Sequence, residues 1–229
     1  MAVTFKPKTD KKEYLKNWRL IHPDYDKNYN QVNRLRRIKN NRNLKLEAIY
    51  VLSLGTNKCM WEGCTEDRID GLTIQHKHSG GGKHKKEING HLYFWLKKNN
   101  YPTDDYEIYC ANHQHEFKLI YGESKHNKNP TSEQLKEREY QQKYKDQLRW
   151  ETFVAYSNSL IPFCIKCCTT NVYHLCLDHT HGDGAEDRKE MGDGTALYSK
   201  LRKLGYPDKN KYQVMCHTCN LIKKIEKGE

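Results

Sequence analysis

The sequence of 229 residues contains no uninterrupted run of about 18 apolar residues, so we expect no transmembrane helix. Its first residues, MAVTFKPKTDKKEY, lack the apolar stretch of a signal peptide, and we therefore expect a cytoplasmic protein that makes no contact with a membrane. Apolar residues are scarce as a class, at 36% of the chain, where globular domains have about 45–50%. A core this thin is typical of small modules that gain folding free energy from a bound metal ion, and the length allows one or two domains.

The cysteines, nine in number, would be unusual in a reducing cytosol unless most of them bind metal. They form closely spaced pairs: Cys59 with Cys64, Cys110 with His113, Cys164 with Cys167, and Cys216 with Cys219. Such pairs in tight turns converge on a tetrahedral zinc ion, whereas a disulfide framework would require export. The spacing therefore predicts two structural zinc ions, with Cys168 as an alternative ligand to its neighbour Cys167.

Positive charge is concentrated near the N-terminus. Residues 1–45 hold 13 Lys and Arg against 4 Asp and Glu, and thus nine of the eleven net positive charges of the chain. A basic arm on a nearly neutral body is typical of proteins that bind a polyanion. A solvated, partly disordered tail is the alternative, but the aromatic residues Tyr14, Trp18, Tyr25 and Tyr29 favour a helix, a break at Pro23 and a second, basic helix.

The chain contains an internal repeat, in which residues 72–88, 92–102 and 106–118 resemble residues 175–191, 197–207 and 212–224 in the same order. Each unit is expected to contain a lead-in helix, a ligand pair, a strand, a Gly-rich turn, a helix, a second strand with the second ligand pair, and a final helix. We therefore divide the chain into an arm (1–45), a first zinc module (46–120), a polar linker with a charged helix (121–148) and a second zinc module (149–229).

The second unit combines groups suited to hydrolysis of a phosphodiester. Four thiolates leave no open position on zinc, so this ion only ties the strand of Asp178 and His179 to the helix that begins near Asn220. Carboxylate and amide oxygens suit Mg²⁺ or another hard divalent ion, and a neutral imidazole can act as general base for water. The alternative is a zinc module whose polar residues only cap turns.

This unit resembles the HNH, or ββα-metal, endonucleases, and in particular the zinc-containing kind found in the phage endonuclease VII group. The residues that carry the resemblance are Cys164, Cys167, Leu177–Gly182 (LDHTHG), Cys216, Cys219 and Asn220. The resemblance implies a β-hairpin followed by a helix, with Asp178 and Asn220 binding a catalytic Mg²⁺ or Mn²⁺, His179 as general base and His181 in support. Lys223 stands where some relatives have an acidic residue, which leaves the metal with two protein ligands.

The first unit departs further from this pattern. Gln75 replaces the aspartate and Gln114 the asparagine, although His76 and the zinc ligands remain. We interpret this unit as a catalytically inactive copy kept for architecture or DNA contact. The competing hypothesis is that His78 or His115 rebuilds a metal site there.

The expected fold class is thus α+β, with two tandem HNH-like zinc modules behind a basic helical arm. The expected function is metal-dependent cleavage of DNA, in which the second unit cuts and the first unit and the arm hold the duplex. The alternative is a zinc-stapled nucleic-acid-binding or architectural protein without catalysis. The sequence leaves open the DNA target, duplex or branched; a homing, restriction or resolving role; nicking or double-strand cleavage; RNA as substrate; and a monomer or a homodimer. An origin in a phage or mobile element is implied by the resemblance alone.

Overall fold

The computed structural model of the chain describes residues 11–78, 80–121 and 131–227, and the polar linker around 122–130 lies outside them. Within these ranges the fold is α+β, as predicted, because helices surround two separate two-stranded antiparallel sheets. No helix in these ranges has both the length and the apolar character needed to cross a bilayer.

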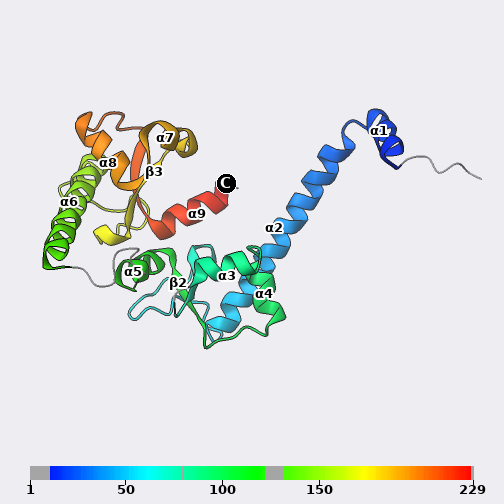
Figure 1. The fold of residues 1–229 in the computed structure, drawn as a ribbon, viewed down its shortest axis with the longest axis horizontal. Coiled ribbons are helices and arrows are strands. Elements are labelled where there is room, and N and C mark those ends of the chain that lie inside the picture. The colour runs from blue at the N-terminus through cyan, green and yellow to red at the C-terminus, as the bar shows by residue number, and fades with distance from the viewer. Residues whose placement is uncertain (1–10, 79, 122–130, 228–229) are drawn as a thin grey trace, which may run out of the picture.

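The internal repeat is present in the structure as two modules with the same order of elements (Figure 1). The first module contains α2 (Tyr25–Leu52), η1 (Ile69–Gly71), β1 (Leu72–His76), α3 (Gly81–Glu87), α4 (Leu92–Lys98), β2 (Tyr106–Cys110) and α5 (Ala111–Tyr121). The second contains α6 (Ser132–Ser157), η2 (Val172–His174), β3 (Leu175–His179), α7 (Gly184–Met191), α8 (Gly194–Lys203), β4 (Tyr212–Cys216) and α9 (His217–Lys227).

Strand register places equivalent residues of the two modules in equivalent positions. In the first sheet Leu72 pairs with Cys110 and His76 with Tyr106, and in the second Leu175 pairs with Cys216 and His179 with Tyr212. Each hairpin therefore carries zinc ligands at one end and a histidine at the other.

Each module has its own small hydrophobic core, formed where the C-terminal part of the lead-in helix packs on the sheet and on the following helices. The first core includes Ala48, Ile49, Leu52, Leu72, Leu96 and Ile108, and the second includes Phe153, Leu175, Leu197, Leu201, Val214 and Met215. Burial of each large apolar side chain contributes roughly 1.5–3 kcal/mol, so cores of this size leave room for a stabilising contribution from metal.

The arm consists of α1 (Lys11–Ile21), a break at Pro23 and the long helix α2, as the sequence predicts. Helix α2 continues without interruption across residue 45, where we expected the arm to end, because Ala48, Ile49 and Leu52 on the same helix belong to the first core. Its N-terminal half stands clear of both modules (Figure 1).

Helix α6 similarly crosses the expected boundary at residue 148. It begins with a capping box in which the side chains of Thr131 and Gln134 each bond to the other residue's backbone amide. The expected charged helix and the lead-in helix of the second module are therefore one element, with Phe153 buried near its C-terminal end.

The two modules meet through α5 and α9, whose first turns make reciprocal contacts. The backbone N–H of Asn112 donates to the hydroxyl of Thr218 (3.1 Å), and the backbone N–H of Thr218 donates to the side-chain oxygen of Asn112 (2.9 Å). The rings of His115 and His217 stack beside them, with centroids 4.1 Å apart. Asn112 and Thr218 are equivalent residues of the repeat, so the interface relates the modules by an approximate two-fold axis.

Candidate functional site

Two clusters of Cys and His side chains can each hold one zinc ion. The ligand atoms of Cys59, Cys64, Cys110 and His113 lie within 4.8 Å of one another, and so do those of Cys164, Cys167, Cys216 and Cys219. In both clusters the first pair lies in the turns before a 3₁₀ helix, and the second pair spans the end of a strand and the first turn of a helix. These donor sets suit tetrahedral zinc, so both predicted ligand sets are brought together.

The geometry distinguishes the ligand Cys167 from its neighbour Cys168. Cys167 belongs to the cluster, whereas Cys168 is exposed, with a φ of 61°, and lies outside it. Cys176 lies on β3, where burial raises the pKa of its thiol to about 11. Neither Cys168 nor Cys176 is therefore needed as a zinc ligand.

Each zinc cluster is also contacted by the opposite module. Glu116, which lies 4.0 Å from the Nε2 atom of His113, accepts a hydrogen bond of 2.7 Å from His174 of the second module. In the other direction, the guanidinium of Arg68 lies 3.7 Å from the sulfur of Cys219. Groups that contact metal ligands in this way fix the orientation of the ligands.

The predicted catalytic residues Asp178, His179 and Asn220 line one cavity of about 460 Å³ in the second module. Asp178 lies on β3, and its carboxylate accepts hydrogen bonds from Gln213 (2.7 Å) and Lys223 (2.6 Å). Asn220 lies in the first turns of α9, and its side-chain nitrogen donates to the sulfur of Cys176 at 3.4 Å.

The side-chain oxygen of Asn220 is buried and has no hydrogen-bond partner in the described chain. A buried polar atom without a partner is costly unless a ligand, water or ion satisfies it. Asn220 and Asp178 line the same cavity, and amide and carboxylate oxygens are donor types that suit a hard divalent cation such as Mg²⁺ or Mn²⁺. Lys223 adds a positive charge to the same carboxylate, where the resemblance leads us to expect an acidic ligand.

His179 is held by a buried acid that the sequence analysis did not identify. Its Nε2 atom bonds to the carboxylate of Asp187 at 2.8 Å, and that carboxylate also accepts from Lys211 (2.6 Å) and the hydroxyl of Tyr212 (2.7 Å). Burial alone would raise the pKa of Asp187, but the hydrogen bonds from Lys211, His179 and Tyr212 lower it to about 2. Asp187 is therefore a carboxylate at neutral pH.

Gly184 completes the surroundings of the imidazole. A Cβ atom at this position would lie only 2.8 Å from the Nδ1 atom of His179. Because glycine has no Cβ, the ring can approach the backbone of α7 closely, and residue 184 places no side chain against Nδ1. His181, in contrast, is exposed and is not among the residues that line the cavity.

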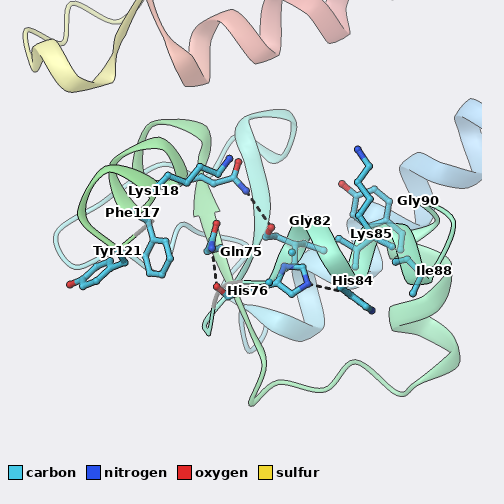
Figure 2. A pocket seen from close by; sticks show the side chains of 16 residues that line it. Gln75, His76, Gly82, His84, Lys85, Ile88, Gly90, Phe117, Lys118 and Tyr121 are labelled. Atoms are coloured by element: carbon cyan, nitrogen blue, oxygen red, sulfur yellow. Dashed lines mark hydrogen bonds between the residues drawn. The ribbon is translucent and has the colours of Figure 1, made fainter. Parts of the chain in front are cut away.

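The first module has an equivalent cavity of about 560 Å³ at the same place in the repeat (Figure 2). Gln75, His76 and Gln114 line it, and the Nε2 atom of His76 bonds to His84 at 3.0 Å, as His179 bonds to Asp187. A Cβ on Gly81 would again lie 2.8 Å from the histidine Nδ1. The surroundings of the histidine are thus retained, whereas Gln75 and His84 stand where the second module has Asp178 and Asp187.

Neither histidine of the competing hypothesis lines this cavity. His78 is exposed, whereas His115 bonds to the backbone oxygen of Tyr173 at 3.1 Å and stacks on His217 at the interface between the modules. His78 and His115 therefore provide no ligand with which a metal site could be rebuilt in the first cavity.

Comparisons of the chain with family models, with curated proteins and with solved structures gave no match.

Proposed function

We propose that this protein is a metal-dependent DNA endonuclease of the HNH type, with its active site in the cavity of the second module. The observation that carries the proposal is that Asp178, His179 and Asn220, distant in sequence, line one cavity, with His179 bonded to a buried carboxylate. The two zinc clusters have a structural role, because their four protein ligands leave no position for water.

His179 acts as the general base for water. Asp187 can only accept a hydrogen bond as a carboxylate, so the proton of the neutral imidazole lies on Nε2 and Nδ1 is the basic nitrogen. Gly184 places no side chain against this nitrogen, and the carboxylate stabilises the imidazolium that forms when water gives up its proton. The arrangement thus orients the base before substrate arrives.

Asp178 and the unpartnered oxygen of Asn220 would hold the divalent ion. When bound, such an ion neutralises charge on a phosphate oxygen and stabilises the leaving oxygen. Lys223 and Lys224, which also line the cavity, place positive charge near the substrate phosphates.

Basic side chains of α2 would bind the DNA backbone outside the active site. Arg34, Arg36 and Arg37 are exposed and lie in the N-terminal half of this helix. For each phosphate that such a side chain neutralises, the logarithm of the DNA-binding constant falls by about 0.9 for every tenfold rise in salt concentration. Replacing all three by Ala should therefore flatten the salt dependence of duplex binding by up to about three slope units.

The experiment that tests the proposal is a nicking assay on supercoiled plasmid, with Mg²⁺, with Mn²⁺ and without an added divalent ion. We expect cleavage only with a divalent ion, and we expect His179→Ala to abolish it while DNA binding persists. His91→Ala serves as the matched control, because His91 is an exposed histidine outside both cavities. Cleavage by His179→Ala at the wild-type rate would refute the assignment.

The second candidate function is non-catalytic binding of nucleic acid, as a zinc-stapled architectural protein. It is favoured by the first module, which keeps its zinc cluster and fold although the acids of its cavity are replaced. Binding to plasmid and to branched DNA without cleavage, under all metal conditions, would support this function instead.

A further inference from the structure

The cavity of the first module differs from that of the second in a consistent way. Its described lining contains no Asp or Glu, because Gln75 stands at the position of Asp178 and His84 at that of Asp187. Phe117 stands at the position of Lys223, whereas Lys118 keeps the positive charge of Lys224. The acids have thus been replaced by neutral groups, and one lysine by an aromatic ring. Such a lining is poorly suited to a divalent cation.

Aromatic rings form one side of this cavity. Phe117 and Tyr121, one turn apart on α5, have ring centroids 4.9 Å apart, and Figure 2 shows both on the side opposite His84 and Lys85. Tyr121 is 62% exposed, so much of its ring is available to a ligand. The exposed ring of Tyr121 beside a basic surface favours stacking of a nucleobase, whatever its identity, and the half-buried Phe117 packs against that ring.

Polar groups at the same cavity suit the remaining parts of a nucleotide. The side-chain nitrogens of Gln75 and Gln114 donate to backbone oxygens of His76 (2.8 Å) and Ile74 (3.4 Å), which leaves their amide oxygens as acceptors for a base amino group. Lys85 and Lys118, both exposed, provide positive charge for a phosphate. The volume of about 560 Å³ lies within the range of roughly 300–1,000 Å³ that small-molecule sites occupy.

We propose that this cavity binds one nucleotide without a divalent ion, with the base stacked on Tyr121 and the phosphate paired with Lys118. The nucleotide can come from an unpaired position in a DNA strand or from free mononucleotide. The first source rests on the proposed function, in which the protein acts on DNA, whereas the second does not.

The test is calorimetric titration of the zinc-loaded full-length protein, without added Mg²⁺ or Mn²⁺. The probes are dAMP, deoxyadenosine, inorganic phosphate, a perfect duplex and the same duplex with one unpaired adenosine. We expect dAMP to bind more tightly than deoxyadenosine or phosphate. We also expect Tyr121→Ala and Lys118→Ala each to weaken dAMP binding about fivefold or more, since stacking or a charged hydrogen bond contributes at least about 1 kcal/mol.

Matched controls are available on α6, where Tyr140 and Lys136 are exposed and distant in sequence from the cavity. Tyr140→Ala and Lys136→Ala should bind dAMP as the wild type does. All four substitutions affect exposed side chains, and retention of two zinc ions per chain would show that the variants are folded. Equal effects of the cavity and control variants would overturn the proposal.

The remaining outcomes separate the ligand sources. Tighter binding of the duplex with the unpaired adenosine, lost in Tyr121→Ala, would identify a strand nucleotide as the ligand, and dAMP binding without that preference would identify free mononucleotide. Inorganic phosphate binding as tightly as dAMP, or no binding of any probe at millimolar concentration, would overturn the site. Plasmid nicking is scored separately, so dAMP binding without nicking would refute the endonuclease and leave the nucleotide site standing.

Discussion

Asp187→Asn should slow DNA cleavage strongly while leaving DNA binding nearly unchanged. Asp187 lies outside the reach of substrate, with only 3% of its side chain exposed, and acts through His179. The substitution keeps the shape of the side chain but removes its charge. An asparagine can also present its N–H to the imidazole, and the proton would then move to Nδ1, the nitrogen that must accept a proton from water.

The size of the effect follows from the hydrogen bond that is lost. The bond between His179 and Asp187 is 2.8 Å long and involves an ionised carboxylate. A hydrogen bond to a charged group contributes about 1.5–3 kcal/mol, and about 1.4 kcal/mol corresponds to a tenfold change in rate. We therefore expect kcat to fall by about 10- to 150-fold. The hydrogen bonds from Lys211 and Tyr212 should partly hold the substituted side chain in place.

The assay is the rate of plasmid nicking at saturating Mg²⁺, measured over a range of DNA concentration to separate kcat from KM. Glu186→Gln is the matched control, because Glu186 lies next to Asp187 on α7 but is exposed. We expect the control to cleave at the wild-type rate and Asp187→Asn to lose kcat with little change in KM. A rate for Asp187→Asn within twofold of wild type would refute the role of this carboxylate. A matching loss in Glu186→Gln would show that α7 is merely destabilised.

Further predictions concern zinc, sterics, the interface and acid stability. Cys167→Ser should lower the zinc content from two ions per chain to one, whereas Cys168→Ser should keep both, as measured by elemental analysis. Gly184→Ala should reduce nicking at unchanged zinc content, because the new methyl group would lie 2.8 Å from the base nitrogen. Asn112→Ala should lower the free energy of unfolding by about 1–3 kcal/mol in denaturant titration, because it leaves groups at the interface unpaired. Asp187 has a folded pKa of about 2 against about 3.9 when unfolded. Its stabilising contribution is therefore complete above pH 4 and lost towards pH 2, and acid unfolding of Asp187→Asn should lack this component.

The parts of this structure that depend on local spacing could be predicted from the sequence. Ligands two to four residues apart must lie in one turn, and the repeat shows which pair joins which. The predicted zinc set joins the strand of Asp178 to the helix of Asn220, and both residues line one cavity in the structure. Asp187 was not identified, although the repeat aligns it with His84, because its role depends on contacts with Tyr212 on β4 and with Lys211 just before that strand.

Helices α2 and α6 run through the expected ends of the arm and of the linker, for a physical reason. Both ends were placed where the composition changes from charged to apolar, at residues 45 and 148, but a helix continues through such a change when each segment favours helix. In α2 and α6 the apolar C-terminal part enters a core and the polar N-terminal part extends the same hydrogen-bond ladder. Composition indicates burial along a helix, and it does not mark where the helix ends.

The interface between the modules determines how the two chemically different cavities are placed relative to each other. Asn112 and Thr218 lie within two residues of zinc ligands, and a Cβ on Gly71 would lie 2.6 Å from a methyl group of Thr218. The modules thus approach through the first turns of α5 and α9, which carry His113 and Cys219 of the two clusters that could hold zinc. Gln114 and Asn220, which line the two cavities, lie two residues after Asn112 and Thr218 on these same helices. Two sites of opposite chemistry, one with acids and one without, are therefore fixed in position relative to each other, which would allow one cavity to hold a strand while the other cuts.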